Sequence, residues 1–409
     1  MKLKISLNIF DILINIISVL IFASSYFDVM GRRTTGNSVW AYLFSYSLYT
    51  ITVLCVITIW LFLHKEKRVY LSVVIMLLVF VYEVILSGTF GILKVQEIIR
   101  DNLAWILTFC SFYCYASMGR ISGNTLFVQI VNTGTAVYCL LVIPNIYMHM
   151  MGMDSQGNII APLYYSFGFL GLVLMYSGRS TKMFFSIVIS VMILLSEKRT
   201  GFLIIIIGLL LLGIVKTNMG GTRGQRIRKY MRLVIVAALA AWAGYWLIDI
   251  YNINVIDRMR LLFREGDTGS GRLIIWRLII NYFRKSSFTH KVFGYGFHAV
   301  PVLVHPLGRA IFAHNCFLEI LFDFGYVGLA FILAAITWCS VTTLKMFWWQ
   351  HKWTPIMAYA LVVILLLSMF GYFFEESRFI MPIMMICGIC LGTWHEDRME
   401  CAKSSTGMR

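Results

Sequence analysis

The sequence predicts an all-α protein that crosses a membrane about twelve times. Of its 409 residues, 59% are hydrophobic and only 13% are charged, whereas about a quarter of the residues of a soluble domain carry a charge. The apolar residues form long runs, and about 20 of them can cross the ~30 Å hydrocarbon core as a helix. Only helices and closed barrels satisfy every backbone polar group in lipid, and runs of this length without alternation favour helices.

Twelve apolar runs are candidates for the spans. We expect them at residues 9–27, 39–63, 69–90, 102–118, 124–148, 161–177, 181–197, 200–216, 232–250, 314–338, 354–372 and 377–394. No small-x-small cleavage site follows the first run, which indicates an uncleaved first helix. The predicted organisation is therefore nine helices in 1–250, one long loop in 251–313, three helices in 314–394 and a tail in 395–409.

Basic residues are shared unequally between alternate loops. One set of loops holds Lys65, Lys67, Arg68, Arg120, Arg179, Lys182, Lys216, Arg223, Arg226, Arg228, Lys229, Arg232, Lys345 and Lys352. The short loops of the other set hold Arg32, Arg33, Lys94, Arg100, Lys198, Arg199 and Arg378. Because Lys and Arg collect in cytoplasmic loops, the first set and both termini are predicted to be cytoplasmic. The same rule accounts for much of the net charge of +16, so nucleic acid is not expected as a partner.

Seven of the nine cysteines fall inside apolar runs, including Cys387 and Cys390, which have the spacing of a redox motif. A soluble thiol cannot reach such a pair inside a span. We therefore expect these cysteines to serve as small residues at helix contacts rather than as disulfides or metal ligands.

The loop 251–313 is predicted to lie on the outer face, and it carries nine basic and three acidic residues. Long loops are exempt from the charge rule that orients short ones, so this excess needs its own explanation. Apolar segments such as 273–276 suggest short amphipathic helices against the membrane. An anionic, membrane-tethered substrate would suit such a loop, and attraction to anionic lipid headgroups is the alternative.

Two clusters hold arginine in a defined position. Residues 196–200 form a charged turn between apolar spans, which keeps Arg199 at the membrane boundary. Residues 269–277 join a glycine-rich turn to a short helix on which Arg272 and Trp276 share one face. Arg grips a phosphate in two places at once, and aromatic rings stack on sugars. The pattern indicates a pyrophosphate beside a sugar; helix capping and an ordinary interfacial Arg–Trp pair are the alternatives.

Two further clusters contain glycine and histidine. Residues 293–297 form a turn that allows close backbone approach, without the strand and helix of a nucleotide-binding fingerprint. Residues 313–319 open the tenth span with His314, which can accept a proton from a sugar hydroxyl near neutral pH. Asn315 and Glu319 share a face of this helix, and a carboxylate inside a membrane indicates a functional site. A capping or interfacial histidine is the alternative.

In this order the clusters resemble the O-antigen polymerase and ligase family (Wzy and WaaL types). The resemblance covers roughly residues 180–335, and it rests on Ser196-x-x-Arg199, Arg272-x-x-x-Trp276, Gly294-x-Gly296, His314-Asn315 and the segment 324–328. Each motif is short, and the ordered set around one long outer loop is what is specific. Members of this family transfer a glycan from undecaprenyl pyrophosphate to an acceptor hydroxyl, without a nucleotide sugar or a required metal.

The resemblance implies a role for each motif residue. Arg199 and Arg272 would clamp the pyrophosphate, and His314 would be the base that activates the acceptor, with inversion at the anomeric centre. Sugar contacts, or contacts that support these three residues, would come from Arg277, Trp276, Tyr295, Asn315 and Glu319.

The implied protein is a GT-C-like polysaccharide polymerase of the bacterial cytoplasmic membrane, with its site on the outer face and no cofactor or metal. Its expected partners are an undecaprenyl-pyrophosphate-linked oligosaccharide, membrane lipid, a flippase and a chain-length regulator.

Three other functions are considered. A ligase would use the same chemistry with lipid A core as acceptor; the His-Asn pair before a Glu-bearing apolar helix favours the polymerase. A secondary transporter or flippase often has twelve spans and would give Glu83 a role. Few mid-span Gly or Pro residues, the absence of an internal repeat and the outer-face clusters argue against transport. A lipid-organising scaffold without chemistry is the last alternative.

Overall fold

The computed structural model describes residues 8–34, 38–66, 70–89, 95–153, 159–196, 198–219, 224–225, 227–228, 272–304, 312–371, 373–375 and 377–405. These residues form helices and no strand, which confirms the all-α prediction for the part of the chain that they represent. Five of the helices are long and apolar enough to cross a membrane. The chain is therefore an all-α membrane protein.

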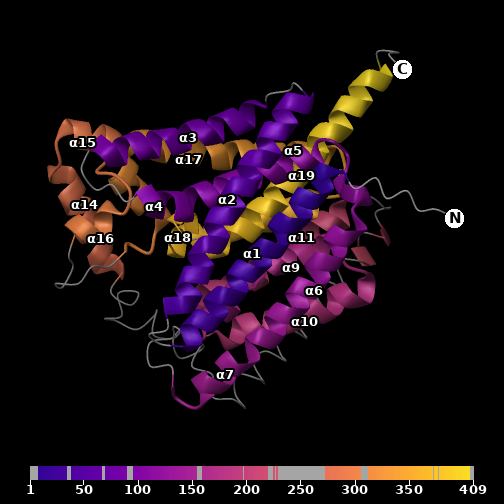
Figure 1. Cartoon of the computed structure of the whole chain (residues 1–409), viewed down its shortest axis with the longest axis horizontal. Coiled ribbons are helices and arrows are strands. Elements are labelled where there is room, and N and C mark those ends of the chain that lie inside the picture. Colours follow the sequence, from indigo (N-terminus) through magenta and orange to yellow (C-terminus); the bar gives the residue numbers. More distant parts are fainter. Residues whose placement is uncertain are drawn as a thin grey trace. The chain divides into compact units, whose positions relative to one another are not determined.

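The described helices of the first half are α1 Ile9–Arg33, α2 Ser38–Glu66, α3 Leu71–Thr89, α4 Val95–Ile98, the π-helix η1 Ile99–Leu103, α5 Ala104–Ala116, η2 Ile121–Gly123, α6 Thr125–Leu141, α7 Ile143–Met150, α8 Ala161–Tyr165, α9 Phe167–Tyr176 and α10 Arg179–Leu195 (Figure 1). Those of the second half are α11 Arg199–Asn218, α14 Arg272–Lys285, α15 Phe288–Phe293, α16 Ala299–Leu303, α17 Cys316–Trp348, α18 Thr354–Phe370, η5 Phe373–Glu375 and α19 Ser377–Ser405.

Eleven of the predicted spans fall on these helices, and the predicted ninth span, 232–250, lies outside the described residues. Two helices continue about ten residues beyond their predicted ends. The tenth span, expected at 314–338, is part of α17, which continues to Trp348 and is kinked at Gly325. The last span continues through Ser405, so the predicted tail begins as helix. The extension of α19 contains good helix formers such as Glu396, Arg398 and Ala402, which continue the helix beyond the point where its apolar residues end.

The chain divides into two compact units. The first comprises residues 1–77, 99–192 and 377–409. In it α19 packs against α5 through glycine: a Cβ atom added at Gly388 would lie only 2.7 Å from the carbonyl oxygen of Phe109. Cys387 and Cys390 are buried on the same helix. No disulfide joins the nine cysteines in the described structure, and the role of Cys387 and Cys390 as small residues at a helix contact remains a prediction.

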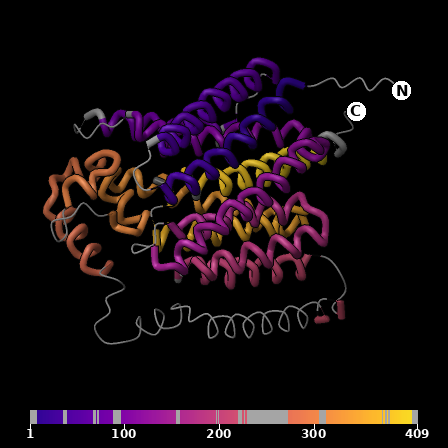
Figure 2. The backbone as a smooth tube through the Cα atoms, turned by 60° about the horizontal axis from the view of Figure 1, so that its bottom comes forward, coloured from indigo at the N-terminus to yellow at the C-terminus, as the bar shows by residue number. Residues whose placement is uncertain are grey.

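The second unit comprises residues 78–98 and 193–376. Here α18 packs against α11 and α17, while the short helices α14, α15 and α16 pack against α17 (Figure 2). These three helices belong to the segment that was predicted to be a long loop with short helices. They rest on a small apolar cluster formed by Ile275, Ile279, Phe283, Ala299, Val300, Val304, Ala313 and Phe322. All further site residues discussed below belong to this unit.

Candidate functional site

Arg272 is the first residue of α14, and its guanidinium is held at the end of another helix. Its Nη1 donates a hydrogen bond of 3.1 Å to the carbonyl oxygen of Phe370, the last residue of α18. The final carbonyls of a helix have no partner within the helix and carry partial negative charge, so a cation is favoured there. This bond fixes where the positive charge of Arg272 lies.

Trp276 lies one turn further along α14, on the face that carries Arg272. Its indole Nε1 donates a hydrogen bond of 2.8 Å to the carbonyl oxygen of Ala313, the residue before His314. The indole body packs against the apolar cluster below α14. The predicted shared face is thus used for two anchoring bonds, one from each side chain, and Trp276 anchors the backbone beside the proposed base.

His314 has a left-handed backbone conformation, with φ 52°. This region is sparsely populated by residues other than glycine, although histidine enters it more often than most. The Ala313 carbonyl is bound by Trp276 on one side of His314. On the other side, Asn315 caps α17, and its Oδ1 accepts a hydrogen bond of 3.1 Å from the backbone N–H of Leu318. The histidine is therefore held between two fixed points, just before α17 begins.

The surroundings of His314 favour its neutral form. Burial, the charge of Arg272 and the charge of Lys198, in that order, lower the pKa of His314 from 6.5 to about 4. Desolvation and nearby positive charge both disfavour an imidazolium ion. The two charge effects also show that Arg272 and Lys198 lie near His314. At neutral pH the ring is uncharged and able to accept a proton.

The predicted clamp Arg199 is the first residue of α11, but its side chain lies outside the described part of the structure. Its neighbour Lys198 is exposed, and the backbone N–H of Lys198 donates a hydrogen bond of 3.4 Å to Ser196 Oγ. Sequence reasoning assigned no role to Lys198. The sequence did contain an indication of this role, because Lys198 and Arg199 form a basic pair in the charged turn 196–200.

The start of α17 contacts η5, the short helix that follows α18. The backbone N–H of Phe374 donates to Cys316 Sγ at 3.5 Å. Together with the bond between Arg272 and Phe370, this places the beginnings of α14 and α17 beside residues 370–374. The two motifs, 42 residues apart in the sequence, thus lie beside the same short segment.

The remaining predicted contact residues take several positions. Glu319 lies in the first turn of α17 and is 1% exposed. Arg277 is exposed on α14. Tyr295 stacks between the rings of His290 and Phe322, and its hydroxyl donates a hydrogen bond of 2.7 Å to Ser286. A contact of these residues with sugar remains a prediction.

The glycine turn allows the close backbone approach that its sequence indicated. Gly294 has φ 84°, and an added Cβ would collide with the backbone of Asp323. The N–H of Tyr295 donates 3.1 Å to the carbonyl of Phe322, and that of Gly296 donates 2.8 Å to the carbonyl of Asp323. These carbonyls are available because α17 is interrupted at Gly325.

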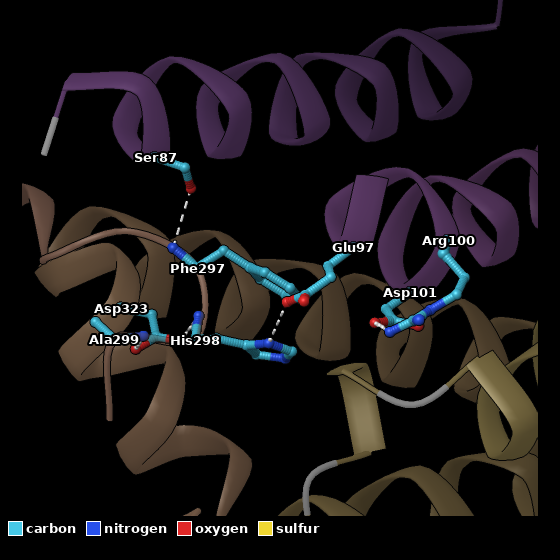
Figure 3. A network of polar contacts seen from close by, with 8 residues as sticks. All are labelled: Ser87, Glu97, Arg100, Asp101, Phe297, His298, Ala299 and Asp323. Carbon is cyan, nitrogen blue, oxygen red and sulfur yellow. Dashed lines mark hydrogen bonds and ion pairs between the residues drawn. The ribbon is translucent and has the colours of Figure 1, made fainter. Parts of the chain in front are cut away.

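Asp323 lies on α17, one turn beyond Glu319. In the structure its carboxylate accepts hydrogen bonds from three successive backbone amides. Those of His298 and Ala299 are drawn in Figure 3, and the third is that of Val300. Within the described residues, no group of three His, Cys, Asp or Glu side chains is placed to hold a metal ion.

Comparison with known proteins gives one match. Residues 184–333 match the family model described as O-antigen ligase, whereas comparison with curated proteins found no match. The matched region contains Lys198, Arg199, Arg272, Trp276 and His314, and it covers most of the segment on which the motif resemblance rests. This match supports the resemblance to the O-antigen polymerase and ligase family for this part of the chain.

Proposed function

We propose that this protein is a polysaccharide polymerase that joins undecaprenyl-pyrophosphate-linked repeat units at the outer face of the bacterial cytoplasmic membrane. The observation that carries the proposal is the neighbourhood of His314: a half-buried neutral imidazole within the influence of two basic side chains, Arg272 and Lys198. A base beside an anion-binding group is what transfer from a pyrophosphate carrier requires.

The proposed reaction exchanges one bond to the anomeric carbon for another. His314 accepts the proton of an acceptor hydroxyl as the hydroxyl oxygen attacks the anomeric carbon of the donor. The bond from that carbon to the pyrophosphate oxygen breaks, and the electron pair leaves with the pyrophosphate. Attack from the opposite face inverts the anomeric centre. No nucleotide sugar or metal takes part in this scheme.

Arg272 and Arg199 would stabilise the charge that develops on the departing pyrophosphate. Arg272 supports this role because its bond to Phe370 holds the guanidinium in place before any substrate binds. A charge that is already positioned needs little reorganisation during the reaction, and such electrostatic stabilisation is usually the largest contribution to catalysis. The role of Arg199 rests on the motif alone.

The low pKa of His314 fits a base that becomes stronger when substrate is bound. Positive charges at Arg272 and Lys198 contribute to lowering the pKa of His314 to about 4. A bound pyrophosphate would offset those charges, so the pKa of His314 would rise toward the working pH. A general base is most effective when its pKa lies near that pH.

The proposal is tested with the purified full-length protein in liposomes. Lipid-linked repeat unit is supplied as the sole glycan, and the products are resolved by size. Wild-type protein should yield a ladder of joined repeats, because a polymerase uses one repeat unit as donor and another as acceptor. His314→Ala should insert normally and yield no ladder. His64→Ala, at an exposed histidine of α2 in the other unit, should behave as wild type.

A ladder of normal length from His314→Ala would remove the catalytic assignment. Ligase activity is the second candidate, because the matching family model is described as O-antigen ligase. A second reaction therefore adds lipid A core together with preformed lipid-linked polymer. Transfer to the core without chain growth in the first reaction would identify a ligase, and movement of intact lipid-linked glycan across the bilayer without any new bond would identify a transporter.

A further inference from the structure

Asp323 is a buried carboxylate that the proposed reaction does not use. It lies in α17 and is 1% exposed. Its Oδ2 accepts a hydrogen bond of 2.8 Å from the N–H of His298, and its Oδ1 accepts one of 3.0 Å from the N–H of Ala299 (Figure 3). Oδ1 also accepts a bond of 3.3 Å from the N–H of Val300. Both oxygens are thus committed to one short stretch of backbone at the start of α16.

The stretch that Asp323 binds has an unusual conformation. His298 is left-handed, with φ 59°, and Gly296 just before it has φ 97°. This geometry turns three consecutive N–H groups toward one point, where a carboxylate can accept all of them. Bonds between an ionised acceptor and backbone N–H groups are stronger than bonds between neutral groups. The charge of Asp323 therefore stabilises a backbone shape that the sequence does not favour by itself.

The same stretch is connected to His314 by packing and by one hydrogen bond. Ala299 and Val300 lie in the apolar cluster that also contains Ala313. Trp276 packs against this cluster and donates its indole N–H to the carbonyl of Ala313. A displacement of α16 would loosen the cluster under Trp276 and Ala313, and His314 is the next residue.

We propose that Asp323 is a positioning residue for His314, which acts by fixing the start of α16 and, through the apolar cluster, the backbone that carries the base. The inference rests on the proposed function for its catalytic consequence. The positioning itself can be measured without any glycan.

A second carboxylate in the same network provides a matched control. Glu97 contacts the ring of His298, with its Oε2 3.5 Å from Nδ1 (Figure 3). Asp323 contacts the backbone N–H of that residue. Asp323→Asn and Glu97→Gln each replace a carboxylate by an amide of equal size beside His298, and only the first disturbs the backbone amides.

The first measurement uses diethyl pyrocarbonate, which modifies neutral imidazoles, with modification of His314 followed by peptide mass spectrometry. In Asp323→Asn the amide NH₂ group faces backbone donors and cannot replace the second acceptor oxygen. His314 should then be modified several times faster than in wild type, because the packing around it is looser. Glu97→Gln should leave the rate unchanged. An unchanged rate in Asp323→Asn would overturn the proposal.

The second measurement separates kcat from KM in the liposome reaction. A base displaced by about an ångström can lose about 100-fold in rate, so kcat of Asp323→Asn should fall by about 10- to 100-fold. The KM for lipid-linked donor should stay within about twofold, because an interaction needed only in the transition state affects kcat. An equal loss in Glu97→Gln would indicate a general weakening of the fold and would also overturn the proposal.

The two measurements distinguish the two hypotheses. If wild-type protein joins no glycan, the proposed function fails, and the modification rates still decide whether Asp323 positions His314. If Asp323→Asn does not accumulate in the membrane, Ser87→Ala replaces it. Ser87 Oγ accepts a hydrogen bond of 3.0 Å from the N–H of Phe297, next to the same stretch. Its loss should raise the modification rate of His314 less strongly but in the same direction, and no change would overturn the proposal.

Discussion

His314 carries a left-handed backbone conformation that few side chains adopt. Such conformations cost about 1–3 kcal/mol and persist only where the surroundings enforce them. Here the surroundings are the Trp276 bond to Ala313 and the Asn315 cap of α17. At the scale of single residues, the site therefore consists of one strained histidine, the groups that hold its backbone and the basic side chains that lower its pKa.

The guanidinium shape of Arg272 should matter as well as its charge. Arg272→Lys keeps a positive charge but loses the planar fork that can bind a phosphate in two places. One charge-assisted hydrogen bond contributes about 1.5–3 kcal/mol, which corresponds to a loss of roughly 10- to 100-fold in kcat/KM. Arg284→Lys, at an exposed position in the last turn of the same helix, is the control. Full activity of Arg272→Lys would show that Arg272 is only a surface charge.

The lowered pKa of His314 predicts the acid side of the pH profile. An imidazolium ion cannot accept a proton, so activity is lost as pH falls through the pKa of the base. With that pKa at about 4 rather than 6.5, kcat/KM should stay level down to about pH 5, since kcat/KM reports groups of the unliganded enzyme. Protein incubated at each low pH and assayed at neutral pH controls for unfolding.

Lys198→Met tests the cause of this shift. Removing one of the positive charges near His314 should raise the pKa of His314, and the acid limb should move to higher pH. An acid limb that stays in place in Lys198→Met would contradict this cause. For the wild-type protein, a kcat/KM that already falls by half near pH 6.5 would contradict the proposed environment of His314.

At the scale of elements, α17 is interrupted where the glycine turn of residues 293–297 packs against it. Gly325 has φ 65° and ψ −164°, a combination that is essentially restricted to glycine. The interruption exposes the carbonyls of Phe322 and Asp323, which accept bonds from Tyr295 and Gly296. The hydroxyl of Tyr82 donates 3.2 Å to the carbonyl of Phe324 beside them. The kink is therefore the feature that joins α17 to the glycine turn.

Gly325→Ala should destabilise the protein strongly. A Cβ at this position would collide with the carbonyl of Val292 and would also meet the strained backbone angle. We expect a loss of about 3 kcal/mol or more, read as a lower unfolding temperature of the detergent-solubilised protein. Gly178→Ala is the control, because an added Cβ there meets nothing within 4 Å. Equal unfolding temperatures for both variants would show that the close approach at Gly325 is not tight.

At the scale of the whole molecule, the charge asymmetry predicts that the loop helices face outward and the termini inward. Cys401, near the end of α19, is exposed and should therefore face the cytoplasm. Thr289 on α15 is exposed and should lie on the outer side, together with His314.

Labelling with a maleimide that does not cross membranes tests this orientation. In intact cells, wild-type protein should remain unlabelled at Cys401 until the membrane is permeabilised. Thr289→Cys should gain one label in intact cells at the new site. Labelling of Cys401 before permeabilisation would reverse the orientation and would place the proposed site on the cytoplasmic side.

Local patterns in the sequence were enough to predict the helical membrane class and the shared face of Arg272 and Trp276. Hydropathy and the helical repeat depend on neighbours within one or two turns, so the sequence carries them directly. The same is true of the position of His314 near the start of a helix, although α17 itself begins at Cys316. The continuation of α17 to Trp348 and of α19 to Ser405 was missed, because both helices extend past the residues that the hydropathy pattern assigned to the spans.

Tertiary structure alone decided what each of these residues touches. The bond from Arg272 reaches 98 residues ahead to Phe370, and that from Trp276 reaches 37 residues ahead to Ala313. The three amides that Asp323 binds lie 23 to 25 residues before it. No periodicity connects residues at such separations. They meet because helices that pack through their apolar sides bring their ends together, and the polar groups at those ends then find partners.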